Sequence, residues 1–182
     1  MNQNTYRKSS RDYTVELWRF IFCIVVLGFH FFIRTKYSFF RAGYLGVEFF
    51  FVLSGCGIYS YYIKQMQGTS FSDRLYQFGR YIGLRLIRLY PLYLISLLCM
   101  LLFRALSSGW NVTKVFSYMK MGWAEFCMLQ CGPLGNAVLI SAHWYVAAFF
   151  WGSVILLLLL MLTGRVGGYA ICPVTSLLIY RY

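Results

Sequence analysis

The sequence predicts an all-α fold, a polytopic membrane helix bundle with about four transmembrane helices and a short, incomplete fifth. Composition, the length of the apolar runs and the basic connectors between them all support this prediction. Hydrophobic residues make up 60% of the 182 residues and charged residues only 12%. So little polar surface cannot cover a water-soluble globule, whereas a lipid bilayer can solvate such a chain. The lipid bilayer is therefore the first expected partner.

The first two spans follow from apolar runs long enough to cross a bilayer, which takes about 20 helical residues. A polar tail at 1–13 precedes the first run, at 15–33, and the second run occupies 44–62. Glycines in the second run allow close helix packing. Both runs are expected to form transmembrane helices, and the first is too long for a cleavable signal peptide.

The third span is predicted at 89–103, after a polar and basic stretch at 64–88 that is interpreted as a connector. Pro91 then falls in the first turn of this helix, where proline is tolerated. The spacing therefore places the start of the third helix just after Arg88.

The C-terminal part contains one more clear span. The mixed region 104–135 is predicted to be a loop or a partly re-entrant segment, and the run 144–162 is the fourth span. The last run, 169–180, is shorter than the roughly 17 residues that a crossing requires, so it predicts an interrupted fifth helix. The chain is expected to be truncated at its C-terminus.

The charge is strongly positive, with 17 Lys and Arg residues against five acidic ones. These bases are scattered between apolar runs and no nucleic-acid-binding motif is present, so nucleic acid is excluded as a partner and an anionic ligand at the membrane is favoured. Bases are more frequent in the tail and in 64–88 than in the other connectors, which predicts a cytoplasmic N-terminus under the positive-inside rule. The expected localisation is a cell membrane, in multi-pass form.

The six cysteines form no CxxC pair and indicate no metal site. Cys127 and Cys131 lie in the connecting region and could pair in an oxidising compartment, although free thiols are favoured.

Ionisable residues inside the spans indicate function, because a charge in hydrocarbon costs several kcal/mol unless it lines a cavity or has a partner. Arg19 and His30 lie on one helix face, since their separation corresponds to about three turns. This face either lines a passage through the membrane or is unremarkable, with Arg19 paired to Glu16 and His30 satisfied near the interface. Glu48 is equally a catalytic candidate and a structural counter-charge.

Arg85 and Arg88 are neighbours on a helical surface at the predicted start of the third helix. Two guanidinium groups beside the positive end of a helix dipole can hold phosphate groups. The alternative is that they only anchor the helix at the cytoplasmic interface.

Several linked motifs resemble those of the acyltransferase type 3 family of multi-span membrane O-acyltransferases. Arg19 and His30 are similar to that family's arginine and histidine signature, and the stretch 43–55 (GYLGVEFFFVLSG) is similar to its Gly-Val-acid-aromatic-Ser-Gly block. The segment 85–91 (RLIRLYP) resembles the family's Arg-x-x-Arg-x-Tyr-Pro element, and His143-Trp144-Tyr145 resembles a later aromatic element. The order and spacing of these motifs support the resemblance over 13–150.

The resemblance implies transfer of an acyl group, usually acetyl, from acyl-CoA to a hydroxyl of a carbohydrate or cell-envelope acceptor. Arg85 and Arg88 would bind the coenzyme A phosphates, and Arg19 would line the path of the thioester arm. His30 would act as a general base or carry the acyl group, with Glu48 orienting it. The expected walls of the substrate path are Phe50, Ser54, Trp144 and Tyr145.

The resemblance also implies a domain organisation, with a cytoplasmic tail at 1–13 and a membrane acyltransferase domain at 14–182. Acyl-CoA is expected as the donor substrate, with no permanently bound cofactor and no metal. Family members usually carry more spans, so a second chain could supply missing helices. Two other classes remain open, namely a transporter or flippase that moves substrate without consuming acyl-CoA and a truncated, non-catalytic membrane fragment.

Overall fold

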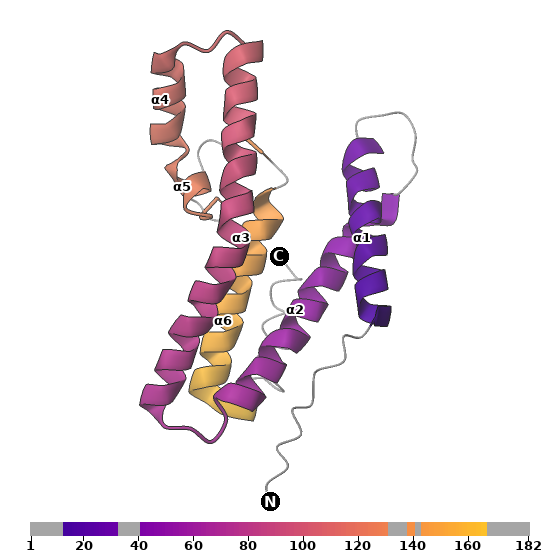
Figure 1. Ribbon diagram of the computed structural model, residues 1–182, viewed down its shortest axis with the longest axis vertical. Helices are drawn as coiled ribbons and strands as arrows, with labels where there is room; N and C mark the ends of the chain where they lie inside the picture. The colour runs from indigo at the N-terminus through magenta and orange to yellow at the C-terminus, as the bar shows by residue number, and fades with distance from the viewer. Residues whose placement is uncertain (1–12, 33–40, 131–137, 141–142, 167–182) are drawn as a thin grey trace, which may run out of the picture. The chain divides into compact units, whose positions relative to one another are not determined.

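The computed structural model describes residues 13–32, 41–130, 138–140 and 143–166, and this part of the chain is built from helices (Figure 1). These elements are α1 (Tyr13–Phe32), the short 3-10 helix η1 (Arg41–Gly43), α2 (Tyr44–Gln65), α3 (Phe71–Ser107), α4 (Val112–Met121), α5 (Trp123–Phe126) and α6 (Trp144–Val166). The chain divides into two compact units, Met1–Leu53 and Ser54–Tyr182, and each is described by itself.

Four helices, α1, α2, α3 and α6, are long and apolar enough to cross a membrane. The predicted fold class, a helical membrane bundle with about four spans, is therefore confirmed. The run 169–180, predicted as an interrupted fifth helix, lies outside the described residues.

In the first unit, α1 packs against the start of α2 through small residues. A Cβ atom added to Gly46 would lie 2.7 Å from Cγ2 of Val26, so only glycine allows this approach of the two helices. The rings of Phe22 and Phe49 stack beside it with their centroids 4.3 Å apart. None of the residues of α1 is buried, and Leu27 is 71% exposed. Such apolar exposure suits a helix that faces lipid.

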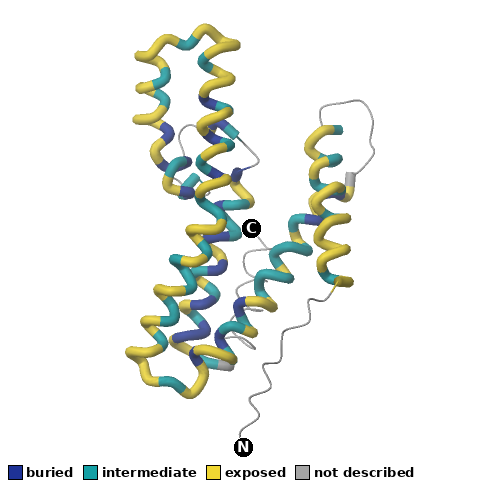
Figure 2. Tube along the Cα trace, viewed as in Figure 1, coloured by how far each residue is buried: buried dark blue, intermediate teal, exposed yellow. Residues whose placement is uncertain are grey.

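In the second unit, α6 is the central helix. Each of its buried residues after the first follows an earlier one by three or four positions, which places them on one helical stripe: Ala147, Phe150, Ser153, Leu157, Leu160 and Met161. Figure 2 shows buried and intermediate segments where α6 and α3 run side by side, and exposed segments elsewhere on both helices.

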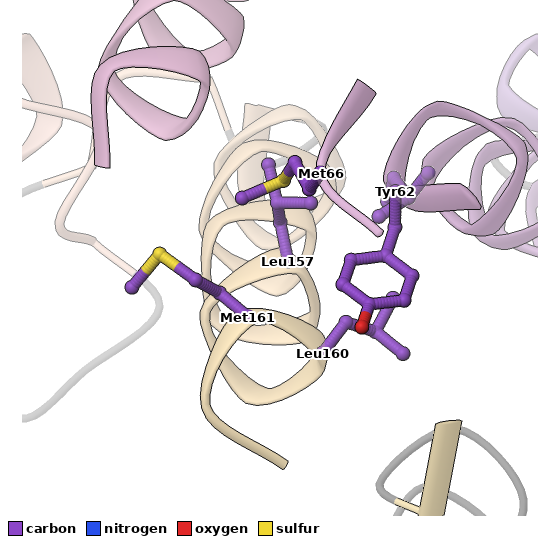
Figure 3. Packing of buried hydrophobic residues seen from close by; sticks show 6 residues of the cluster. Tyr62, Met66, Leu157, Leu160 and Met161 are labelled. Carbon is purple, nitrogen blue, oxygen red and sulfur yellow. The ribbon is translucent and has the colours of Figure 1, made fainter. Parts of the chain in front are cut away.

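Two clusters hold α6 in place. Phe150 and Ala147 pack with Tyr93 of α3. Nearer the end of α6, Leu157 packs with Tyr62 in the last turn of α2 and with Met66 directly after it, as Figure 3 shows. The second half of α2, α3 and α6 thus share a hydrophobic core.

The third span begins much earlier than predicted, at Phe71, so the interpretation of 64–88 as a connector is wrong. The Ser70 hydroxyl caps α3 by accepting a hydrogen bond from the backbone N–H of Asp73 at 3.2 Å. Partly buried residues then recur at helical spacing before Arg88: Arg74, Phe78, Tyr81 and Arg85. This packed stripe keeps a polar stretch helical, and the connector is reduced to 66–70.

This longer helix corrects two further predictions. Arg85 and Arg88 lie in the interior of α3, so the predicted contribution of a helix N-terminus to an anion site is wrong. Pro91 also lies inside the helix and not in its first turn. With 37 residues α3 is about 55 Å long, more than the hydrocarbon thickness of about 30 Å, so part of it must extend beyond the hydrocarbon.

The region 104–135, predicted to be a loop or a partly re-entrant segment, contains α4 and α5 and doubles back along α3. Tyr93 donates a hydrogen bond to the backbone carbonyl of Glu125 at 2.6 Å, and Tyr90 donates to that of Phe126 at 3.2 Å. Because α3 continues to Ser107, the chain has returned by about 20 Å along this helix when it reaches Glu125. The return path brings α5 next to the middle of α3.

Candidate functional site

The three candidates of the first unit lie on the exposed faces of α1 and α2. Arg19 donates to Glu16 at 2.9 Å, and the two side chains are 46% and 54% exposed. The sequence left two interpretations of Arg19 open, and this ion pair with Glu16 is one of them. His30 and Glu48 are both exposed. Within the described residues, no hydrogen bond or ion pair joins Arg19, His30 and Glu48 to one another.

A cavity of about 340 Å³ lies in the second unit. Side chains from α2, α3 and α6 line it: Tyr61, Tyr81, Leu84, Arg85, Arg88, Leu89 and Phe149. The structure therefore brings the two arginines singled out by sequence to one concave site. The volume falls in the range of about 300–1,000 Å³ that is typical of small-molecule sites.

Arg85 is held at this cavity by neighbours from all three helices. Its Nη1 donates to the hydroxyl of Tyr81 at 2.6 Å, and its Nη2 donates to the hydroxyl of Ser54 at 2.8 Å. The guanidinium carbon lies 4.3 Å from the ring centroid of Phe149, within cation-π range, and Nη2 reaches the backbone carbonyl of that residue at 3.5 Å. The guanidinium is therefore fixed in position by neutral groups.

The charge of this cavity is not balanced by protein groups in the described part of the chain. No ion pair joins Arg85 or Arg88 to a carboxylate there, and the Nε atom of Arg85 is buried without a hydrogen-bond partner. A partly buried cation with a buried, unused donor is unfavourable on its own, so the site favours an anionic or carbonyl oxygen ligand.

The remaining predicted wall residues are not all at this cavity. Ser54 contacts Arg85 directly. Phe50 packs edge-on against Phe49 in α2, with centroids 5.7 Å apart, and belongs to the first unit. Trp144 and Tyr145 occupy the first turn of α6 and do not line the cavity.

A second polar cluster surrounds Glu125, which is 0% exposed. Its Oε2 accepts a hydrogen bond from the Tyr118 hydroxyl at 2.5 Å and another from the backbone N–H of Leu139 at 2.7 Å. Its Oε1 accepts from the backbone N–H of Ile140 at 3.1 Å and lies 3.9 Å from Nδ1 of His143. Three donors suit the ionised, acceptor-only form of the carboxylate. Burial, followed by the hydrogen bond to Glu125, raises the pKa of Tyr118, which keeps this phenol a donor.

His143 links Glu125 to α3. Its Nε2 lies 3.0 Å from the hydroxyl of Ser96, and its ring lies over that of Tyr93 with centroids 4.4 Å apart. Gln130 donates to the backbone carbonyl of His143 at 3.2 Å. Burial lowers the pKa of His143, and the attraction of Glu125 only partly opposes this shift. The imidazole is therefore neutral near pH 7.

Tyr81, Phe149 and Glu125 were not predicted from the sequence as site residues. Tyr81 stands four residues before Arg85, a helical spacing that would have indicated the contact had the third helix been extended. Glu125 is one of only five acidic residues in a very apolar chain, and this rarity was the available signal. Phe149 had no signal in the sequence, because its contact depends on how α6 packs.

Four long apolar helices in the described part of the chain define a multi-span membrane protein. Two arginines that line its cavity pair with no carboxylate among the described residues. A family model described as an acyltransferase domain matches residues 12–181. The chain thus belongs to the acyltransferase type 3 family and is a membrane acyltransferase by family. No curated protein and no solved structure matches it.

Proposed function

We propose that the protein is a membrane O-acyltransferase that moves an acyl group, in the simplest case acetyl, from acyl-CoA to a hydroxyl of a carbohydrate or other cell-envelope acceptor. The family supplies the reaction class. The observation that carries the donor assignment is Arg85, fixed at a cavity of about 340 Å³ with no carboxylate partner among the described residues.

Arg85 and Arg88 bind the phosphate or thioester oxygens of the donor. Guanidinium groups form strong, charge-assisted hydrogen bonds with phosphate, and the Nε donor of Arg85 is available for one. The aromatic rings of Tyr61, Tyr81 and Phe149 offer an apolar wall to the rest of the donor. Arg19 lines the approach of the acyl arm in the first unit.

The chemistry is assigned to His30 and Glu48. His30 either takes the proton of the acceptor hydroxyl or carries the acyl group, and Glu48 orients it. In the net reaction the thioester C–S bond breaks, the ester C–O bond forms, and one proton passes from the hydroxyl to the thiol. Both side chains are exposed in the first unit, which leaves them accessible to substrate. Phe50, Ser54, Trp144 and Tyr145 form the substrate path.

Acetyl-CoA binding to the full chain in lipid nanodiscs tests this proposal, with the wild type compared with the double variant Arg85→Ala, Arg88→Ala. Each charge-assisted hydrogen bond contributes about 1.5–3 kcal/mol, so the double variant should lose affinity by about tenfold or more. Arg80→Ala is the matched control, because Arg80 is exposed on the same helix and does not line the cavity. Equal binding by the double variant, or no binding by the wild type, would overturn the donor assignment.

A further inference from the structure

The buried cluster around His143 has the composition of an acid–base relay. The imidazole stands between the carboxylate of Glu125, 3.9 Å from Nδ1, and the hydroxyl of Ser96, 3.0 Å from Nε2. A carboxylate, an imidazole and a hydroxyl in this order are the groups with which proteins move a proton to and from a hydroxyl. His143 is only 9% exposed, and its Nδ1 is a buried nitrogen with no hydrogen-bond partner among the described residues.

The tautomer of His143 decides whether this cluster can relay a proton. If Nε2 carries the proton, it donates to Ser96, and the bare lone pair of Nδ1 faces the Glu125 carboxylate. This arrangement is repulsive in a buried site, where charges are poorly screened. If Nδ1 carries the proton, the same approach becomes attractive, and Nε2 is free to accept the proton of Ser96.

The hydroxyl of Ser96 has one proton and two acceptors within reach. It lies 2.8 Å from the backbone carbonyl of Tyr93 and 3.0 Å from Nε2 of His143. Donation to the carbonyl is the common behaviour of a helical serine, and donation to the imidazole is the state that a relay needs. A rotation of one hydroxyl proton therefore connects the two states.

We propose that Ser96, His143 and Glu125 form a proton relay that serves acyl transfer, with the proton of neutral His143 on Nδ1 and Nε2 as the acceptor. This inference rests on the proposed function, because acyl transfer moves one proton from the acceptor oxygen to the thiol sulfur. In the alternative in which His30 carries the acyl group, the Ser96 oxygen receives that proton while its own passes to Nε2, and the reverse steps return a proton to the thiolate. Glu125 stabilises the transient imidazolium.

The position of the relay suits this role. His143 immediately precedes α6, and Phe149, which contacts Arg85 at the donor cavity, follows six residues later, or about 9 Å along the helix axis. The groups that face His143 come from several elements: Glu125 from α5, Tyr93 and Ser96 from α3, and Gln130, with Tyr118 of α4 behind Glu125. A base held this way is rigid and shielded from water.

Nitrogen NMR of the ¹⁵N-histidine-labelled full chain tests the tautomer without any substrate. The chain has two histidines, so His30→Gln assigns the signals. Above pH 7 we expect a protonated Nδ1 and an unprotonated Nε2 for His143. In Glu125→Gln the Nδ1 preference should weaken. A wild-type imidazole protonated at Nε2 would overturn the proposal and make His143 a structural tether.

Thiol release from acetyl-CoA by membranes that carry the full chain tests the role in the reaction. Ser96→Ala and His143→Gln should each lower kcat by about 100-fold or more, with KM for acetyl-CoA within about twofold of the wild type. Ser107→Ala, at the exposed end of α3, is the control for serine removal. Unchanged kcat in Ser96→Ala would refute the relay. If the His143 proton is on Nδ1 but the chain does not bind acetyl-CoA, the proposed function is refuted. The arrangement of Ser96, His143 and Glu125 would then still stand.

Discussion

Glu125 shows how one buried carboxylate can organise a whole region. Its side chain receives hydrogen bonds from α4 and from the backbone of Leu139 and Ile140, and its own carbonyl accepts from Tyr93 of α3. Burying a charge without partners is strongly unfavourable, so Glu125 can be buried only because these hydrogen bonds are made. Because the segments that it joins are distant in sequence, the cluster depends on the folded chain.

Arg85 presents the opposite case, a charge surrounded by neutral partners. Ser54, Tyr81 and the Phe149 carbonyl satisfy its two terminal nitrogens but do not neutralise it. The remaining positive charge is what makes the cavity attractive to an anion.

The depressed pKa of His143 predicts a pH dependence of stability. In the unfolded chain His143 has the ordinary histidine pKa of 6.5. In the folded state the pKa is lower, because the imidazole is buried. The contribution of His143 to the free energy of unfolding is therefore complete above this pH and is lost as the pH falls through the folded pKa. In thermal unfolding of the detergent-solubilised chain between pH 7.5 and pH 5, we expect stability to fall with pH in the wild type.

The slope should be reduced in His143→Gln and retained in the control His30→Gln, because His30 is exposed. If the pH dependence of stability disappears only in His30→Gln, then His30 and not His143 causes it, and the prediction is wrong.

Among the helices, α1 and α2 depend on small residues at their contact. A Cβ added to Gly46 would clash with Val26 at 2.7 Å, and one added to Gly43 would lie 2.3 Å from Cβ of Phe29. Neither neighbouring atom is the far end of a flexible side chain, so the helices would have to separate. Close approach through glycine is a common way to join helices where lipid surrounds both.

Gly46→Ala is therefore expected to destabilise the chain by about 1–3 kcal/mol through overpacking. The matched control is Gly55→Ala in the same helix, where a Cβ would meet nothing within 4 Å and helix propensity should improve slightly. Gel filtration of detergent-solubilised protein after heating would compare the two. Loss of the monodisperse peak at equal temperatures in both variants would contradict the predicted role of Gly46.

At the scale of the whole molecule, the described part of the chain contains four helices that are long and apolar enough to cross a membrane. The excess of Lys and Arg in the tail and around the α2–α3 connector predicts that both lie on the cytoplasmic side. If α1 and α2 both cross, two crossings separate these segments, and we expect both segments on one side of the membrane.

Cysteine labelling tests this orientation in intact cells, using single cysteines in a cysteine-free chain. Ser9→Cys in the tail and Ser72→Cys at the start of α3 should react only after the membrane is permeabilised. Ser108→Cys, exposed at the other end of α3, should react with an impermeant reagent from outside. Labelling of Ser9→Cys and Ser72→Cys from opposite sides would show that α1 and α2 do not both cross.

The sequence by itself determined the class of fold, the number of long spans and the membership of Arg85 and Arg88 in one local site. These properties depend on composition and on helical spacing, which are local. It misplaced the start of α3, because the polarity of 64–88 suggests a connector. Packing of Tyr81 and Arg85 against other helices overrides that polarity and keeps the segment helical.

Only the tertiary structure decided the surroundings of these residues. It brings Ser54 and Phe149 from two other helices against Arg85 at the cavity. It also folds α5 back along α3 so that Glu125, His143 and Ser96 meet. Contacts between distant segments depend on which helix faces pack together and on where the chain reverses. Neither is encoded by the periodicity of any one segment, since periodicity identifies the buried face of a helix but not its neighbour.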